Sequence, residues 1–516
     1  MKYISTRGKA PILGFEDALL AGLASDGGLY VPESWPRLSE AMIAGFADKS
    51  FQEIAVDVLH PFMSDDVPRD RLAEMVNEAY ACFEHEAVTP LTDLGDGHYF
   101  LELYHGPTLA FKDVAMQLLA RLMDDALVRR GERATIIGAT SGDTGGAAIE
   151  AFRSREAVDL FILFPDGRVS DVQRKQMTTP RDANVHTLSV DGTFDDCQAL
   201  VKGMFNDAPF RAEMSLAGVN SINWARVMAQ ITYYFVAAAK LGAPRQAVAF
   251  AVPTGNFGDI FAGYVAAQMG LPIAQLMIAT NVNDILARTL ASGVYETDKV
   301  IATQSPSMDI QVSSNFERLL FEVTGRDAVR VRALMSALTQ AGRFEMNHKE
   351  MQLMRALFGA ERVDEAATLD IMRRFREAHG FQIDPHSAVG MGAAEKAVLP
   401  DGVPIVTLAT AHPAKFPKAV AAAYGAEPDT PRRVLDMLEE EERARLYKSI
   451  LEAIQSIEAQ ATLAVRLCML GSSVAVLPRR LDAPADTATL QAVASKAEEL
   501  GFATMATSIS GLNPQL

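Results

Sequence analysis

Three stretches of the chain repeat one pattern of hydrophobic and polar positions. Each begins with a continuous apolar run, passes through a loop marked by Gly or Pro, and ends in a helix-forming stretch of small residues. The apolar runs are Ala134–Thr140, Ala247–Val252 and Pro404–Thr410. Continuous apolar strands followed by helices are typical of parallel sheets covered on both faces. The pattern predicts an α/β fold with ligands at the carboxyl ends of the strands, where the loops lie.

The rest of the chain predicts how this fold is extended. Further apolar runs predict strands at Asp159–Phe164, Asn184–Val190 and Ile273–Thr280. The first 95 residues differ, because a helical stretch at 69–87 follows a turn-rich segment at 26–36, and we expect a separate N-terminal domain over 1–95. A central region of two α/β subdomains follows over 96–430, and its part from 313 to 400 is largely helical and charged.

The segment 431–516 is expected to form a C-terminal extension. Its isoleucines and leucines recur at helical spacing from Leu446 to Ile457 and predict an amphipathic helix. A strand is expected at 471–478, and a helix at 486–501 that ends at Gly501.

Composition narrows the classes of partner. At 516 residues the chain has room for about three units, and its 49% hydrophobic and 22% charged content excludes a disordered or collagen-like protein. The 48 basic and 65 acidic side chains leave a net charge of −17, which argues against nucleic acid or an anionic membrane as the main partner. This charge raises the question of how so acidic a protein would bind an anionic ligand.

The cysteines and the apolar runs indicate a compartment. Cys82, Cys197 and Cys468 are few and far apart, so neither a disulfide framework nor a CxxC metal site is expected. Residues 1–15 lack the apolar core of a signal peptide, and no run reaches the ~18 apolar residues that span a bilayer. We therefore expect a cytoplasmic protein, a monomer or a homodimer, without a membrane partner.

Lys112 is the first candidate for chemistry. It follows HGPTLAF (105–111) and begins a predicted helix. The positive end of the helix dipole and partial desolvation both lower the pKa of a lysine at this position. Only the neutral amine attacks an aldehyde, so a lysine with a lowered pKa suits Schiff-base chemistry. A solvated surface lysine at a helix start is the alternative, and Lys112 alone does not decide between the two.

Three loops at predicted strand ends complete the candidate site. GATSGDTGG (138–146) and TGNFGD (254–259) combine glycines with helix N-termini, whose unpaired N–H groups bind anions. Neither loop is a P-loop or a dinucleotide fingerprint, and a structural βα turn is the alternative for each. In TAHPAKF (410–416) a hydroxyl could meet a ring nitrogen. HExxH and GxSxG are absent, so a metal-free mechanism built on a lysine fits what remains.

Together these segments resemble the threonine synthase family, pyridoxal-phosphate enzymes of the tryptophan-synthase-β fold type. The resemblance runs from Met1 to about residue 430, is to the longer branch with an extra N-terminal domain, and does not cover the chain after about 445. The matching motifs are STRG (5–8), DGGLYVP (26–32), HGPTLAFKD (105–113), GATSGDTGGAA (138–148), FPDGRVSDVQ (164–173), VNSINWARV (219–227), PTGNFGDIFAGY (253–264), SPSMDIQVSSNFERLLFE (305–322), DPHSAVG (384–390) and LATAHPAKFP (408–417). It implies two doubly wound twisted sheets with helices on both faces and the cofactor between them.

The resemblance also implies roles for individual residues. Lys112 resembles the lysine that holds pyridoxal 5'-phosphate as a Schiff base, and Thr410 the hydroxyl partner of the pyridine nitrogen. The cradle for the cofactor phosphate is implied at Gly255, Asn256, Phe257, Gly258 and Asp259. The substrate carboxylate and the ring edge are implied at Ser141, Asp143 and Thr144.

The implied reaction converts O-phospho-L-homoserine and water to L-threonine and phosphate, with Lys112 as the base and acid for the carbon protons. Candidates for the substrate phosphate are Arg168, Ser170, Asn223, Arg226 and Lys415. Their alternatives are an interdomain ion pair for the arginines, a turn residue for Asn223 and a surface charge for Lys415. A lyase acting on another phosphorylated amino acid, or a ligand-binding homologue without catalysis, is the alternative for the whole protein.

Overall fold

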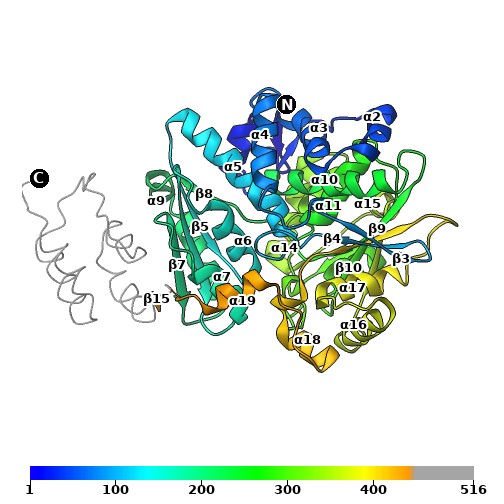
Figure 1. Ribbon diagram of the computed structural model, residues 1–516. Coiled ribbons are helices and arrows are strands. Elements are labelled where there is room, and N and C mark those ends of the chain that lie inside the picture. The colour runs from blue at the N-terminus through cyan, green and yellow to red at the C-terminus, as the bar shows by residue number, and fades with distance from the viewer. Residues whose placement is uncertain (443–444, 447–516) are drawn as a thin grey trace, which may run out of the picture.

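Two sheets form the centre of the molecule, as the computed structural model shows for residues 1–442 and 445–446 (Figure 1). The six-stranded sheet has the order β13-β10-β9-β14-β4-β3, and the five-stranded sheet the order β15-β7-β6-β5-β8. The first comprises β3 (Leu91–Gly95), β4 (His98–Glu102), β9 (Val248–Pro253), β10 (Ile273–Thr280), β13 (Phe358–Arg362) and β14 (Ile405–Ala409). The second comprises β5 (Ala134–Ala139), β6 (Val158–Pro165), β7 (Val185–Val190), β8 (Leu216–Ala217) and β15 (Arg445–Leu446).

The predicted α/β architecture is confirmed, and each strand predicted between residues 134 and 410 is present within two residues of its expected bounds. The five-stranded sheet is parallel throughout. The six-stranded sheet is parallel except at its edge, where β3 runs antiparallel to β4. The β3–β4 hairpin and β13 were not predicted, because these short strands carry polar residues and lack a continuous apolar run.

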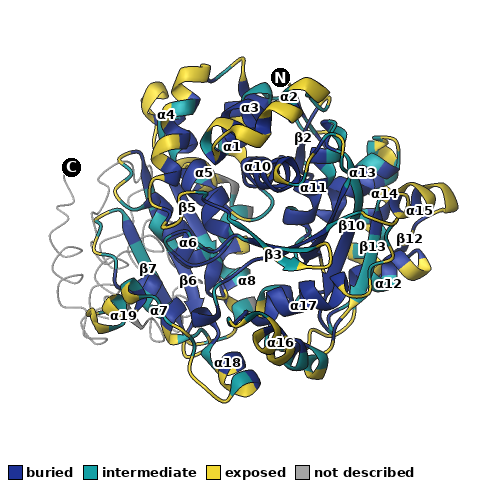
Figure 2. Cartoon of the chain, turned by 45° about the vertical axis from the view of Figure 1, so that its right-hand side comes forward, coloured by how far each residue is buried: buried dark blue, intermediate teal, exposed yellow. Residues whose placement is uncertain are grey.

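Helices cover both sheets and leave the central strands buried, whereas the edge strand β3 is partly exposed (Figure 2). Helices α6 and α8 pack on the five-stranded sheet, and α11 and α17 on the six-stranded sheet. The helices that surround the sheets are α5 (Lys112–Arg130), α6 (Asp143–Phe152), α7 (Asp171–Thr178), α8 (Phe194–Asn206), α9 (Ala208–Glu213), α10 (Trp224–Lys240), α11 (Gly258–Gln268), α12 (Ile285–Ser292), α13 (Phe316–Val323), α14 (Ala328–Ala341), α15 (His348–Arg355), α16 (Glu365–His379), α17 (Pro385–Ala394), α18 (Pro417–Tyr424) and α19 (Arg432–Glu439). Helices α13 to α17 confirm the helical character predicted for 313–400, which also contains β12 (Arg343–Glu345), paired with β11 (Val294–Glu296).

The N-terminal residues form a unit that packs on the central helices. It contains β1 (Tyr3–Ser5), β2 (Tyr30–Pro32), α1 (Phe15–Ala21), α2 (Glu40–Ala44), α3 (Phe51–Met63) and α4 (Arg69–Tyr80). Helix α3 packs on α10 and α4 on α5, so one hydrophobic core joins this unit to the sheets. The helix expected over 69–87 ends at Tyr80, after which the chain turns and the Glu84 N–H donates to the His105 carbonyl. The domain boundaries at 95 and 430 stay predictions.

The last described part of the chain connects the two sheets. After α18, beside the six-stranded sheet, the chain crosses to the other sheet, where α19 packs on α7 and β15 pairs with β7 (Figure 1). Leu446 ends β15; the rest of the helix expected from that residue, the strand at 471–478, the helix at 486–501 and Cys468 lie outside the described residues. No helix within the described part of the chain is both long enough and apolar enough to cross a membrane.

Candidate active site

Lys112 is the first residue of α5, and the loop before it is held by Asp113. The Asp113 carboxylate accepts hydrogen bonds from the Thr108 N–H (2.8 Å) and the Thr108 hydroxyl (2.6 Å). Gly106 must be glycine, because a Cβ there would lie 2.5 Å from the Asp113 Cβ. Burial raises the pKa of Asp113 to about 6. The HGPT loop therefore folds back on the helix and places Lys112 in the interior, where its side chain is 9% exposed.

The third predicted loop lies directly beside this one. Ala110 and Ala411 form an antiparallel bridge, and the Phe111 N–H donates to the Thr410 carbonyl (2.8 Å). Thr410 is buried next to the residues that precede Lys112. The end of β14 and the start of α5 are thus joined, as a shared site requires.

Asp143 forms the centre of the site, between two lysines. Its carboxylate lies 3.2 Å from the Lys112 Nζ and 3.1 Å from the Lys415 Nζ, and accepts a hydrogen bond from the Gln173 amide (2.9 Å). Burial alone would raise the pKa of Asp143, but Lys415 and Lys112 hold it well below its usual range. Burial lowers the pKa of Lys112; Asp143 opposes this shift, while Lys415 and Arg226 add to it. Lys112 therefore has the lowered pKa that the sequence predicted, with burial as the main cause.

The loop between β5 and α6 offers free N–H groups to a ligand. The Thr140 hydroxyl accepts from the N–H groups of Gly142 (3.0 Å) and Gly145 (2.9 Å) and so turns the chain into α6. Within the described residues, the N–H groups of Ser141, Asp143 and Thr144 donate to no protein acceptor. An anion could bind to these three groups at the helix N-terminus.

The loop between β9 and α11 forms a second cradle of this kind. Its carbonyl groups are bound, since that of Gly255 accepts from the Ser313 hydroxyl (2.6 Å) and that of Asn256 from the N–H of Asn315 (3.0 Å). The N–H groups from Gly255 to Asp259 donate to no acceptor in the part of the chain that the structure describes. Phe257 holds a left-handed backbone (φ 62°), with its ring packed on Phe316 and Phe358.

Asp259 is the last residue of the segment 254–259, and two tyrosines of α10 bind its side chain. Its carboxylate accepts from the hydroxyl groups of Tyr233 and Tyr234, the latter at 3.0 Å, while its second oxygen is buried without a partner. Burial raises the pKa of Asp259 to about 6, although both tyrosines and the charge of Lys112 oppose the shift.

Arg226 is a buried cation with no carboxylate bound to it among the described residues. One guanidinium nitrogen donates to the Val219 carbonyl (3.3 Å), and Nε has no partner. Burial lowers the pKa of Arg226 to about 10. The charge of Arg226 also lowers the pKa of Lys112, and an anionic ligand at this site would supply the partner that Arg226 lacks.

The other candidates for the substrate phosphate occupy different environments. Arg168 is exposed, and the Ser170 hydroxyl caps α7 by accepting from the Gln173 N–H (3.3 Å). The Asn223 side chain is bound to backbone groups at the start of α10 and to the Leu19 carbonyl. Lys415 is fully buried and donates to the Thr108 carbonyl (2.6 Å), to Gln176 (2.9 Å) and to Asp143. Among these five candidates, Arg226 is the buried cation that the described residues leave with an unpaired donor.

Two groups in this site were not predicted from the sequence. On α7, Gln173 binds Asp143 and Gln176 binds Lys415. The capping box formed by Ser170 and Gln173 is the sequence signal that could have pointed to this helix start. His386 on α17 accepts from the N–H of Ser307, whose hydroxyl lies 3.5 Å from Asp143. His386 is held in turn by Asp384 (2.7 Å). These residues connect the six-stranded sheet to Asp143.

Comparisons with known proteins assign the family. Family descriptions match over residues 2–80 (threonine synthase N terminus), 83–411 (pyridoxal-phosphate dependent enzyme) and 387–457 (threonine synthase, C-terminal). The third match extends past residue 430, where the resemblance was expected to end.

Individual relatives agree with this assignment. The chain is 50% identical to a threonine synthase of Pseudomonas aeruginosa, over 89% of this chain and 98% of that one, and 43% identical to one of Saccharomyces cerevisiae, over 81% and 88%. A crystal structure of pyridoxal-phosphate-bound threonine synthase from Brucella melitensis is 57% identical, with a TM-score of 0.85 over 89% of this chain and all of that one. The chain therefore belongs to the pyridoxal-phosphate-dependent enzymes and, within them, to the threonine synthase family.

Proposed function

We propose that this protein converts O-phospho-L-homoserine and water to L-threonine and phosphate. The observation that carries the proposal is the burial of Lys112, with a lowered pKa, against Asp143 and between two loops of free N–H groups. A lysine in this state suits Schiff-base chemistry, and the two loops offer one anion site each to a cofactor and a substrate.

The residues present fit pyridoxal 5'-phosphate. The free N–H groups from Gly255 to Asp259 would hold its phosphate, the Lys112 Nζ its aldehyde carbon, and the Thr410 hydroxyl its pyridine nitrogen. When bound, the cofactor supplies the electron sink that acidifies the protons at Cα and Cβ of the substrate. A hydroxyl partner, unlike a carboxylate, does not force protonation of the pyridine nitrogen, which favours elimination and replacement over transamination.

The remaining roles belong to the chain's own residues. Lys112, once released by the substrate, would take and return the protons at Cα and Cβ. The N–H groups of Ser141, Asp143 and Thr144 would bind the substrate carboxylate. Arg226 is the best-placed of the proposed phosphate partners, because its Nε is buried without a partner. The donors of Lys415 are already bound, so we assign it the task of holding Asp143 and the Thr108 loop.

The proposal is tested by locating the cofactor and measuring phosphate release. After borohydride reduction, peptide mass spectrometry should find a pyridoxyl group on Lys112, and Lys112→Ala should abolish both this label and phosphate release from O-phosphohomoserine. Lys418→Ala, at an exposed lysine on α18, is the matched control and should change neither. Label on another lysine, or no turnover of O-phosphohomoserine by a labelled enzyme, would contradict the proposal.

Substrate identity needs its own comparison. Phosphoserine, phosphothreonine and free threonine should be turned over far more slowly than O-phosphohomoserine; the opposite order would indicate a related lyase. We further infer a cytoplasmic enzyme, in agreement with the free thiols of Cys82 and Cys197. We expect it to act as a monomer or a homodimer.

A further inference from the structure

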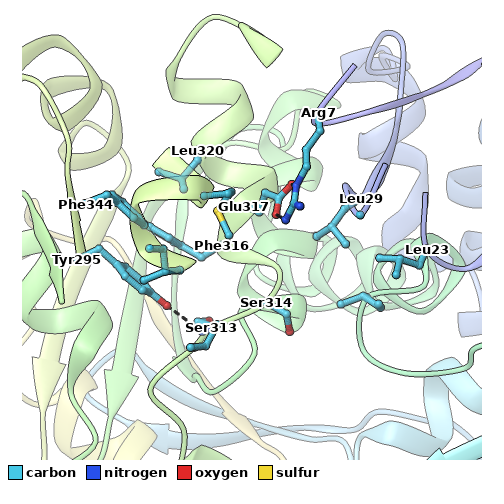
Figure 3. A pocket seen from close by; sticks show the side chains of 15 residues that line it. Arg7, Leu23, Leu29, Tyr295, Ser313, Ser314, Phe316, Glu317, Leu320 and Phe344 are labelled. Atoms are coloured by element: carbon cyan, nitrogen blue, oxygen red, sulfur yellow. Dashed lines mark hydrogen bonds and ion pairs between the residues drawn. The ribbon is translucent and has the colours of Figure 1, made fainter. Parts of the chain in front are cut away.

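A pocket of about 230 Å³ lies between the N-terminal unit and α13, apart from the candidate active site (Figure 3). The N-terminal unit contributes one wall, and the segment around α13 with β11, β12 and α14 contributes the other. Lys112, Asp143 and Lys415 do not line it. Its polar lining residues include Arg7, Tyr295, Ser313, Ser314 and Glu317.

The lining of the pocket carries a charge of each sign. Arg7 donates through Nε (3.0 Å) and Nη2 (2.9 Å) to the two carboxylate oxygens of Glu317. Its remaining nitrogen, Nη1, has no acceptor among the described residues. The Tyr295 hydroxyl accepts from the Ser313 N–H (2.9 Å), and within the same described range its own proton has no acceptor. Glu317 also accepts from the Thr6 hydroxyl (2.6 Å), so the cation and the anion are paired with each other, and the donors left for a ligand are Arg7 Nη1 and the Tyr295 hydroxyl.

The rest of the pocket is apolar. Figure 3 shows Leu23 and Leu29 facing the side chains of Phe316, Leu320 and Phe344 across the opening. A pair of opposite charges between hydrocarbon walls complements a molecule with a zwitterionic head and an apolar side chain. We propose that this pocket is a second binding site, for a free apolar α-amino acid whose carboxylate lies on Arg7 and whose ammonium group lies on Glu317.

The wall of this pocket is bonded directly to the loop that would hold the cofactor phosphate. The Ser313 hydroxyl donates to the Gly255 carbonyl (2.6 Å), and the Ser314 hydroxyl to the Asn256 side chain (2.9 Å). A ligand that fills the pocket restrains both serines and thereby orders the loop from 255 to 259. Occupancy of the pocket thus raises the affinity for pyridoxal phosphate, a consequence that rests on the proposed function.

Binding is tested by titrating L-leucine into the holoenzyme in a calorimeter. Borohydride reduction beforehand occupies the catalytic lysine permanently, so that an amino acid cannot react there. We expect saturation with a Kd of about 0.1–1 mM, the range for so small a ligand. Leucinamide, which lacks the carboxylate, and isovalerate, which lacks the ammonium group, should each bind about tenfold more weakly.

Two variants place the binding in this pocket. Leu338→Trp fills the cavity from α14 and should abolish leucine binding while leaving phosphate release unchanged. Arg7→Met should weaken binding about tenfold, and Arg37→Met, at an exposed arginine of the same unit, should not. Should Arg7→Met fail to fold because Glu317 loses its partner, Leu338→Trp decides alone. Absence of saturable heat, or binding that survives Leu338→Trp, would overturn the proposal.

Coupling to the cofactor is measured separately, as the Kd of pyridoxal phosphate with and without saturating L-leucine. We expect leucine to lower this Kd about threefold in the parent enzyme and to leave it unchanged in Leu338→Trp. An unchanged Kd in the parent enzyme would overturn the coupling. A reduced holoenzyme that binds leucine, while the unreduced enzyme releases no phosphate from O-phosphohomoserine, would instead contradict the proposed function, since the calorimetric test requires no turnover.

Discussion

Asp143 explains how two lysines can be buried against the same carboxylate. Lys112 and Lys415 would repel one another in the protein interior, where charge is poorly screened. Asp143 contacts both, so it acts as their shared counterion. With Arg226 nearby, the site keeps an excess of positive charge toward which two phosphate groups can bind.

Asp143→Asn should therefore destabilise the cofactor-free protein. Removing one partner of a buried ionic cluster costs about 3–5 kcal/mol, because the other charges stay buried without compensation. Loss of the carboxylate also lowers the pKa of Lys112 further, since Asp143 raises it. Urea unfolding should show the loss, and Asp171→Asn, at an exposed aspartate, should change the free energy of unfolding little. Equal stability of Asp143→Asn and the parent would contradict this role.

Asp259 should make the stability of the cofactor-free protein depend on pH. Its pKa is raised from 3.8 to about 6 by burial, so between these values the folded state binds more protons than the unfolded state. The free energy of unfolding therefore falls as pH rises through this window, by about 3 kcal/mol at and above pH 6. Asp259→Asn, which cannot ionise, should lack this contribution. Urea unfolding at about pH 4, 5 and 6 measures it; parallel curves for the two proteins would show that the carboxyl group is not responsible.

At the residue scale, the sequence predicts the groups whose residue type and local position already indicate a chemical role. Lys112 and the glycine loops could be proposed from residue type and from their positions at helix starts and strand ends, and the family resemblance then implied their roles. Asp143 was predicted as a ligand contact, but its role between two lysines could not be read, because Lys415 lies far away in the sequence. His386 was missed for the same reason, since its contact with Ser307 exists only after two distant segments fold together.

Among the elements, α13 links the N-terminal unit to the candidate cofactor loop. Arg318 on α13 is fully buried and donates to the carbonyl groups of Tyr30 (3.0 Å) in β2 and Ile222 (2.7 Å) before α10. It also bonds the Asn315 side chain, and Asn315 donates to the Asn256 carbonyl (2.9 Å). A single side chain thus joins three segments.

Arg318→Met should loosen that junction. Its buried acceptors lose their donors, each at a cost of about 1–3 kcal/mol, so hydrogen exchange should rise in β1 and β2 and cofactor affinity should fall. Arg318→Lys keeps the charge but not the planar set of donors, and should restore only part of the protection. Arg343→Met, at an exposed arginine, is the control. Unchanged exchange in β1 and β2 would remove Arg318 from this role.

The elements that could be predicted are those whose burial appears in the local sequence. Strands β9 and β14 are buried along their whole length and read as continuous apolar runs. The edge strand β3 is not, and its pairing with β4 depends on the neighbouring sheet rather than on its own residues. The helix expected over 69–87 ended early because tertiary contacts of the turn after Tyr80 override local propensity.

In the whole molecule, α19 closes over loops from both sheets. Val434 packs with Leu109 of the lysine loop, Val172 of α7 and Ala414 beyond β14. Arg433 donates to the Gly106 carbonyl (2.7 Å) and pairs with Glu84 (3.1 Å).

Removing the contact between Arg433 and the loop before Lys112 should lower activity, although Arg433 itself takes no part in the reaction. For Arg433→Ala we expect kcat/KM to fall about tenfold, because the loop before Lys112 loses a restraint on its position. The neighbouring Arg432 is 81% exposed and, within the part of the chain that the structure describes, pairs only with Asp436, so Arg432→Ala should have little effect. Steady-state kinetics of both variants decide; equal losses would show that α19 acts through general stability.

The net charge of −17 and the positive interior site act over different distances. Repulsion of an anionic substrate by the acidic surface is long-range, and salt suppresses it, since the screening length is about 10 Å at 0.1 M. Binding at Arg226 and at the N–H groups is short-range and buried, so salt weakens it much less. Raising sodium chloride from about 50 to 200 mM should therefore increase kcat/KM for O-phosphohomoserine slightly, by less than about twofold, whereas a protein that neutralises many DNA phosphates loses about 10³-fold or more. A steep fall in kcat/KM with salt would mean that the substrate binds to exposed surface cations, such as Arg168, rather than to the buried site.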